Sequence, residues 1–141
     1  MLPNTHLPTF RKRVSIPSKV FILGEYAVLH GFPALVATLA PRFSMRVDQA
    51  EGRESSFHPS SPLAHFKNWA QMQRAGSIAP LHFEDPFQGA GGFGFSTAQF
   101  AMAYFAWMQE ARESILPPTL GWGGWQSVWN LYRELTQNGR N

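Results

Sequence analysis

Two charged side chains stand inside an otherwise apolar stretch near the amino end of the chain. Lys19 and Glu25 lie within residues 17–36, and a Gly-Phe-Pro turn interrupts this stretch at residues 31–33. Burying a charge is costly unless the charge is paired or used, so neither residue fits a plain core strand. In a site, a fixed lysine could stabilise negative charge on a reacting group. Taken alone, Lys19 could also reach solvent from a strand end and Glu25 could cap a turn.

A glycine-rich run is the second candidate for chemistry. Residues 88–97 read Gln-Gly-Ala-Gly-Gly-Phe-Gly-Phe-Ser-Thr, and apolar residues at helical spacing follow directly, from Phe100 to Ala111. A backbone without side chains can approach phosphate oxygens closely, and the first amides of a helix favour an anion. A glycine loop followed by a helix therefore predicts a phosphate-binding site.

Two other interpretations of the glycine run stay open. Residues 89–94 fit the pattern Gly-x-Gly-x-x-Gly, which is typical of a Rossmann dinucleotide-binding turn. That turn opens a first βαβ unit, and an acidic ribose ligand follows about 20 residues later at a strand end. Here the acids downstream, Glu110 and Glu113, are expected on the helix or just past it. The remaining interpretation is a flexible loop that binds nothing.

Both segments, in this order, resemble the motifs of the GHMP small-molecule kinases, the mevalonate kinase type above all. Residues 92–97 line up with a family motif that resembles Gly-Leu-Gly-Ser-Ser-Ala and wraps the triphosphate at a helix start. Phe95 and Thr97 depart from that motif, because the family usually has a small hydroxyl residue where Phe95 stands. In the first segment the matching residues are Pro17, Lys19, Leu23, Gly24, Glu25, Val28 and Gly31.

The resemblance implies Mg·ATP-dependent phosphorylation of a small-molecule alcohol, with mevalonate or a relative as the acceptor and with ATP and Mg²⁺ as cofactors. Ser96 matches the serine whose hydroxyl helps to hold Mg²⁺ and the phosphates. The nucleotide-binding residues implied by the resemblance are Gly91, Gly92, Gly94, Ser96 and Thr97.

The resemblance also gives roles to residues of the first segment. Lys19 matches the lysine that sits close to the transferred phosphoryl group, where a fixed cation would stabilise a loose transition state. Glu25 would be a counter-ion or would organise the site. Tyr26 and His30 would be walls of the substrate pocket.

Only part of a family member is expected in these residues. The family's catalytic aspartate lies in a later Gly-Ser-Gly-x-Asp-like segment, and Asp48 and Asp85 have the wrong context to replace it. The resemblance therefore implies that residues 1–141 are an amino-terminal, ATP-binding domain that catalyses little alone, whether as a fragment, a truncated reading frame or half of a split protein. Its partners would be its missing carboxyl-terminal half or a homodimer mate. In another functional class, the chain would be a degenerate lobe that binds a nucleotide or a partner without turnover.

Composition narrows the functional classes. Twelve basic against nine acidic side chains give a net charge of +3, which favours anionic ligands. This excess is too small to indicate a nucleic-acid-binding surface. The absence of cysteine excludes disulfides and thiolate metal sites. The chain shows no signal-peptide pattern and no apolar run near the ~20 residues of a membrane span. These features predict a cytoplasmic protein without a membrane segment.

The expected elements indicate the α+β class. The resemblance implies a mostly antiparallel sheet packed against helices, like the ribosomal-S5-domain-2-like amino-terminal lobe of GHMP kinases. Helices are expected after Ser61-Pro62, after the glycine run and around Trp125 to Leu135. Strands are expected at residues 10–15 and 20–23, with a break at Pro17, at a buried 34–39, at 43–47 with one wet face, and at 81–84.

Overall fold

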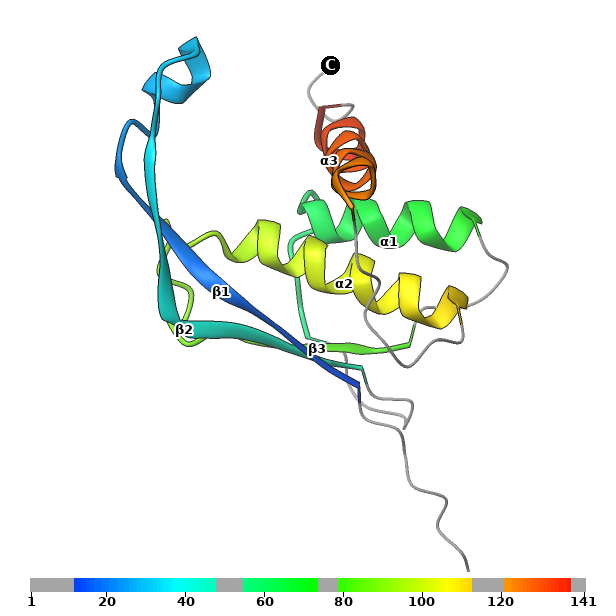
Figure 1. Cartoon of the computed structure of the whole chain (residues 1–141). Helices are drawn as coiled ribbons and strands as arrows, with labels where there is room; N and C mark the ends of the chain where they lie inside the picture. The colour runs from blue at the N-terminus through cyan, green and yellow to red at the C-terminus, as the bar shows by residue number, and fades with distance from the viewer. Residues whose placement is uncertain (1–11, 48–54, 74–78, 113–120, 138–141) are drawn as a thin grey trace, which may run out of the picture.

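A computed structural model of the chain describes residues 12–47, 55–73, 79–112 and 121–137. These residues form an α+β fold, as expected, with a three-stranded antiparallel sheet in the order β1-β2-β3 and three α-helices (Figure 1). None of these helices is long and apolar enough to cross a membrane. The elements in chain order are β1 (Lys12–Leu23), the short 3-10 helix η1 (Ala27–His30), β2 (Leu35–Val47), α1 (Pro62–Gln73), β3 (Leu81–Glu84), α2 (Phe95–Arg112) and α3 (Trp122–Gln137).

The strands β1 and β2 form one long hairpin, so the predicted break at Pro17 is wrong. Their register shifts between Pro17 and Ser18, because Pro17 is opposite Arg42 whereas Ser18 is opposite Leu39. The buried Ser18 hydroxyl donates a hydrogen bond to the Pro41 carbonyl, at 2.8 Å, in the irregular part of β2. A bulge of this kind lets a proline remain in an edge strand without ending the strand.

The core lies between the sheet and the helices. Phe43, Met45 and Val47 are buried and Arg46 between them is exposed, which confirms the predicted strand and its apolar face. Ser44, expected on the wet face, is only 5% exposed. Aromatic rings fill the layer behind them, with Phe66 of α1 against the rings of Trp69, Phe100, Tyr104 and Trp107. The helices α1 and α2 therefore take their places from the same apolar layer that covers β2.

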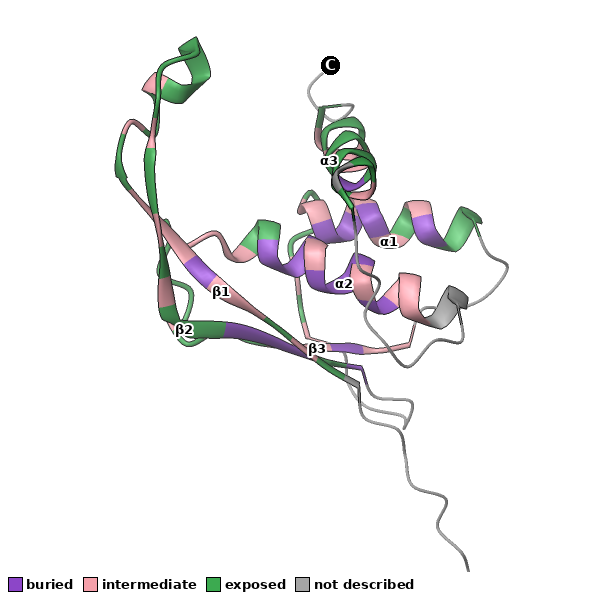
Figure 2. Ribbon diagram, in the orientation of Figure 1, coloured by how far each residue is buried: buried purple, intermediate pink, exposed green. Residues whose placement is uncertain are grey.

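The far end of the hairpin, residues 21–36, extends beyond the helices, and we call it the arm (Figures 1 and 2). The strand predicted at 34–39 is confirmed as the first part of β2, but its predicted burial is wrong, because Leu35 and Val36 are 52% and 47% exposed. The apolar pattern there is real, but the described helices lie over the other end of β2. The exposed large apolar residues of the arm are Ile22, Leu23, Tyr26, Val28, Leu29, Phe32, Leu35 and Val36.

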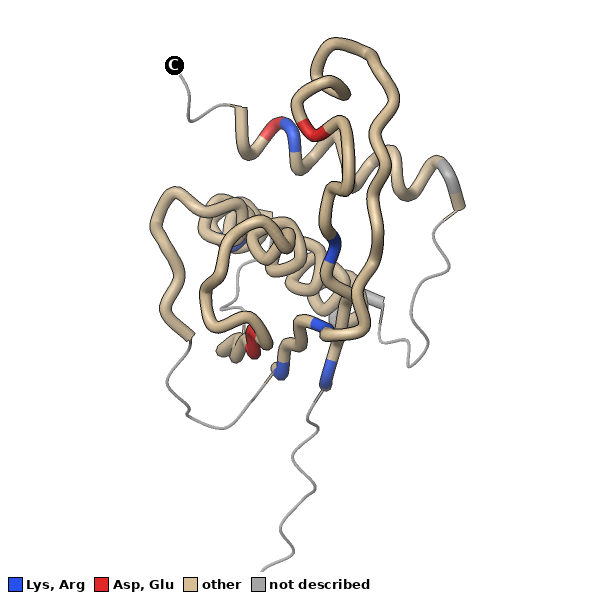
Figure 3. Tube along the Cα trace, turned by 90° about the vertical axis from the view of Figure 1, so that its left-hand side faces the viewer, with Lys and Arg blue, Asp and Glu red and all other residues tan. Residues whose placement is uncertain are grey.

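A cluster of charges lies on the outer face of the sheet, where basic and acidic positions come close together (Figure 3). The Glu84 carboxylate is 3.1 Å from the Arg13 guanidinium and 3.3 Å from that of Arg46. It also accepts a 2.6 Å hydrogen bond from the Ser44 hydroxyl. That hydrogen bond, followed by the two guanidinium charges, lowers the pKa of Glu84 below its ordinary value.

We expect Glu84 to make stability sensitive to acid. Because the folded-state pKa lies below the ordinary 4.5, the carboxylate stabilises the fold above that pH, and this contribution is lost as the pH falls through the lowered pKa. The effect should be small, since the side chain is 47% exposed and solvent screens it. Urea unfolding from about pH 5 to pH 2 should show a shallower loss of unfolding free energy in Glu84→Gln than in wild type. Glu134→Gln on α3 is the control, and equal slopes for Glu84→Gln and wild type would contradict this expectation.

Candidate active site

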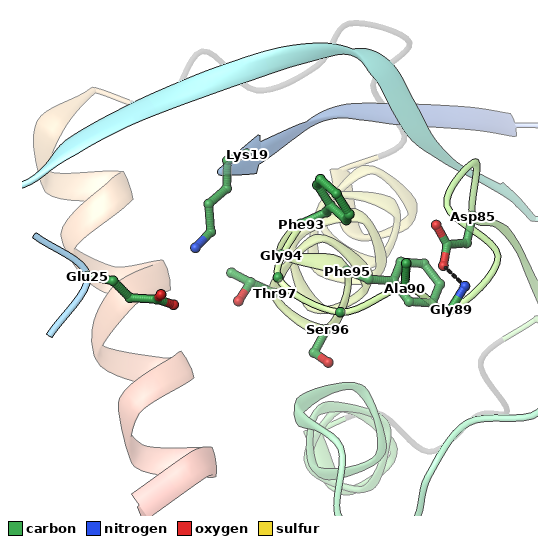
Figure 4. A pocket seen from close by; sticks show the side chains of 12 residues that line it. Lys19, Glu25, Asp85, Gly89, Ala90, Phe93, Gly94, Phe95, Ser96 and Thr97 are labelled. Carbon is green, nitrogen blue, oxygen red and sulfur yellow. Dashed lines mark hydrogen bonds between the residues drawn. The ribbon is translucent and has the colours of Figure 1, made fainter. Parts of the chain in front are cut away.

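A pocket of about 380 Å³ lies where β1, the loop after β3 and the start of α2 meet (Figure 4). Lys19 and Glu25 line it from the hairpin side, and Asp85 and the continuous run 89–97 line the rest. The two segments that the sequence analysis selected are far apart along the chain but lie together here. Among the described residues, every predicted phosphate-binding residue and the predicted lysine line this pocket.

The glycine-rich loop has the backbone that an anion site needs. Gly89, Gly92 and Gly94 have φ values of 86°, 89° and 84°, and left-handed backbone of this kind can form an anion-binding concavity of amides. The first helical hydrogen bond of α2 joins the Ala98 amide to the Gly94 carbonyl at 3.0 Å. The amides of residues 95–97 precede that bond, so they have no partner within the helix and lie at its positive end.

Lys19 is fixed against this loop by its backbone and by its side chain. Its N–H donates to the Phe93 carbonyl at 3.1 Å. Its aliphatic stem crosses Gly94 so closely that a Cβ built there would lie 3.1 Å from Lys19 Cε and 3.2 Å from Cγ. The Nζ atom is 4.1 Å from the centre of the Phe21 ring, a cation–π contact that helps to hold the charge.

The polar side chains around Lys19 point in different directions. Glu25 and Thr97 point toward the space beside the lysine, whereas Ser96 points away from it (Figure 4). None of the ion pairs found among the described residues joins Glu25 to Lys19. The Thr97 hydroxyl is 3.5 Å from the Tyr132 hydroxyl, so α3 reaches this end of the pocket. Thr97, which departs from the family motif, is therefore the hydroxyl residue that faces the lysine.

The aromatic residues of the loop are anchored away from its amides. The Phe95 ring packs against the rings of Phe43 and Phe83, with centroids 5.1 and 6.4 Å away. The Phe93 ring stacks on Phe87 at 3.9 Å and nearly parallel, at 6°. The large residue at position 95 thus ties the start of α2 to the core, and it also forms part of the pocket wall.

Asp85 is a pocket residue that the sequence analysis missed. Its two carboxylate oxygens accept the backbone amides of Phe87 and Gly89, each at 2.8 Å. An aspartate before a proline and a glycine-rich loop is typical of an Asx turn, and that signal could have indicated this role. With both oxygens on amides, Asp85 holds the loop and does not stand free as a base.

Two other predicted site residues lie elsewhere. Tyr26, which is 77% exposed, and the exposed His30 belong to the end of the arm and do not line this pocket. Tyr26 directly precedes η1 and His30 ends it, whereas Glu25, the residue before Tyr26, does line the pocket. Asp48 lies outside the described residues.

A comparison with models of known protein families finds no match, and a comparison with curated proteins finds none either. The likeness to GHMP kinases therefore depends on the residues of the two motifs. The geometry adds that these motifs meet in one pocket.

Proposed function

We propose that this chain is the ATP-binding, amino-terminal part of a cytoplasmic small-molecule kinase of the GHMP type, similar to mevalonate kinases. The main support is the contact between Lys19 and the glycine-rich loop at the start of α2. Phosphoryl transfer depends mostly on positioning and on stabilising negative charge. A loop of free amides beside a fixed ammonium offers both. The antiparallel sheet covered by helices is compatible with an S5-domain-2-like lobe.

In this proposal the groups that line the pocket divide phosphate binding and phosphoryl transfer between them. The amides of residues 91–97 and the positive end of α2 would bind the triphosphate, and a bound Mg²⁺ would supply neutralisation of its charge. The resemblance gives Ser96 the contact with the metal-bound phosphates, but its hydroxyl points away from Lys19, so the hydroxyl beside the transferred phosphoryl group would be that of Thr97. Lys19 would stabilise charge on the transferred phosphoryl group, and Glu25 would organise the acceptor side. The acceptor is a small alcohol such as mevalonate.

Calorimetric titration of the chain with Mg·ATP and with NAD tests the proposal. We expect saturable binding of Mg·ATP and none of NAD, because a Rossmann site needs an acidic residue at the end of a following strand, whereas Glu110 belongs to α2. Binding of NAD without Mg·ATP would favour the Rossmann interpretation. The absence of Mg·ATP binding would refute nucleotide binding by this loop.

A degenerate lobe that binds nucleotide without turnover is the second candidate. The direction of Ser96 favours it, because the hydroxyl that the resemblance assigns to the metal-bound phosphates points away from Lys19. Phosphate transfer from labelled ATP to mevalonate by the full-length protein separates the two candidates. Binding without transfer would leave the degenerate lobe, and transfer would exclude it.

The exposed arm supports a protein partner, which we propose to be a carboxyl-terminal lobe of the GHMP type or a second copy of the chain. A projecting two-stranded hairpin is marginal on its own, and exposed apolar patches mark interaction sites. If the partner is a second copy, sedimentation equilibrium should show a concentration-dependent dimer. Leu29→Glu in the arm should weaken it, and Met72→Glu, an equally exposed position on α1, should not. A monomer at every concentration would exclude the second copy.

A further inference from the structure

We propose that Asp85 is a positioning residue for the phosphate-binding loop, an inference that rests on the proposed kinase function. Its Oδ1 accepts the Phe87 amide and its Oδ2 accepts the Gly89 amide, each at 2.8 Å, and Figure 4 shows the second of these bonds. Hydrogen bonds to an ionised carboxylate are stronger than those between neutral groups. The carboxylate thus ties the first turn of the loop to the end of β3.

The residue between the two bonded amides shows why such a tie is needed. Gln88 has φ 52°, an uncommon conformation for a residue other than glycine, and such conformations persist only where the surroundings enforce them. Two backbone bonds close the same turn, from the Gln88 amide to the Asp85 carbonyl at 3.2 Å and from the Ala90 amide to the Phe87 carbonyl at 3.0 Å. The Asp85 side chain adds two stronger bonds, one on each side of the strained residue.

The two hydrogen bonds of Asp85 also determine which backbone amides of the loop remain available to a ligand. The amides of Phe87 and Gly89 are occupied by Asp85, so phosphate oxygens must bind to the later amides, those of residues 91–97. Holding the first turn keeps these later amides on the side of Lys19. The carboxylate therefore selects the phosphate subsite without touching the phosphate.

The charge of Asp85 would act in the opposite direction. The carboxylate lines the same pocket as the proposed phosphate subsite, so by Coulomb repulsion alone its removal should tighten the binding of an anion. Loss of the tie should weaken the binding, because the loop would have to be ordered by the ligand. The sign of the change in affinity therefore separates a positioning residue from a merely unfavourable charge.

The test is calorimetric titration of wild type, Asp85→Ala and Asp85→Asn with Mg·ATP. We expect the dissociation constant of Asp85→Ala to rise by about tenfold or more, as the loss of charge-assisted hydrogen bonds would produce. Asp85→Asn should be intermediate, since its single amide oxygen can accept only one of the two N–H groups well. Glu84→Gln is the matched control, because it removes the neighbouring charge outside the pocket and should bind within about twofold of wild type.

Hydrogen exchange gives a second measurement that does not depend on the ligand. The amides of Phe87 and Gly89 should exchange faster in Asp85→Ala than in wild type or Glu84→Gln. Unchanged protection of these amides would overturn the inference, as would equal or tighter Mg·ATP binding by both Asp85 variants; in either case the kinase proposal would stand. Failure of the wild-type chain to bind Mg·ATP would overturn the proposed function and this inference with it. If Asp85→Ala does not fold, the Asn variant carries the same test.

Discussion

Replacing Lys19 by Met is expected to lower the turnover of the full-length protein about a hundredfold or more, the size of effect seen when one preorganised charge-stabilising group is removed. Methionine keeps an unbranched apolar stem that can still lie across Gly94, where Lys19 Cγ and Cε now make close contact. Only the charge is lost. Because that charge is needed most when the phosphoryl group is in transfer, kcat should fall much more than the affinity for Mg·ATP. Steady-state kinetics and calorimetry measure the two quantities separately.

Lys67 on α1 supplies the matched control for this change. Its Nζ lies 5.1 Å from the centre of the Phe57 ring, so it is also a lysine over an aromatic ring, but it does not line the pocket. Lys67→Met should leave kcat and Mg·ATP affinity near their wild-type values. Unchanged kcat in Lys19→Met would remove Lys19 from the mechanism, whereas equal losses of kcat in both variants would point to a general loss of structure.

Local sequence patterns predict an element correctly where its residues pack against another part of the described structure. Phe43, Met45 and Val47 alternate with polar residues because one side of β2 meets the helices, and this period was visible in the sequence. The prediction failed where the decisive fact was not local. Pro17 lies in a continuous strand because a bulge in the partner strand accommodates it, and no property of residues 10–23 alone shows that bulge.

An apolar segment tends to be buried, but its sequence does not identify the part of the structure that will bury it. Leu35 and Val36 read as a buried strand, yet they belong to the arm and remain about half exposed in the described structure. The same limit applies to Trp125 and Trp129 of α3, which are 49% and 53% exposed. A pattern in one chain cannot identify a surface that another segment or another copy would supply.

The candidate site can be predicted from the sequence to the extent that its chemistry depends on residue types. Lys19 and the glycine loop were selected from the resemblance, and the structure brings them into contact. For Asp85 the Asx-turn pattern indicates a local role, but which two backbone amides its carboxylate accepts depends on the folded loop. Tyr26 and His30, which the resemblance makes walls of a substrate pocket, do not line the pocket that Lys19 and Glu25 line.

Gly94→Ala is expected to have the second largest effect, because a methyl group there disturbs the loop and the lysine together. The φ of 84° would cost an L-residue about 1–2 kcal/mol, which should appear as a lower unfolding free energy in urea. The new Cβ would also lie 3.1 Å from Lys19 Cε, so the lysine stem must move. Because a misplacement of about 1 Å can cost a hundredfold in rate, turnover should fall well beyond what the loss of stability explains.

Two neighbouring glycines separate these causes. Gly92 has φ 89°, but a Cβ there would meet nothing within 4 Å, so Gly92→Ala should show the loss of stability while its kcat at saturating Mg·ATP stays near wild type. Gly91 has neither a positive φ nor a close neighbour, and Gly91→Ala should leave both quantities nearly unchanged. If Gly92→Ala and Gly94→Ala lose kcat equally, backbone strain alone accounts for the loss. A selective loss in Gly94→Ala means that turnover depends on where this glycine lets the Lys19 side chain lie.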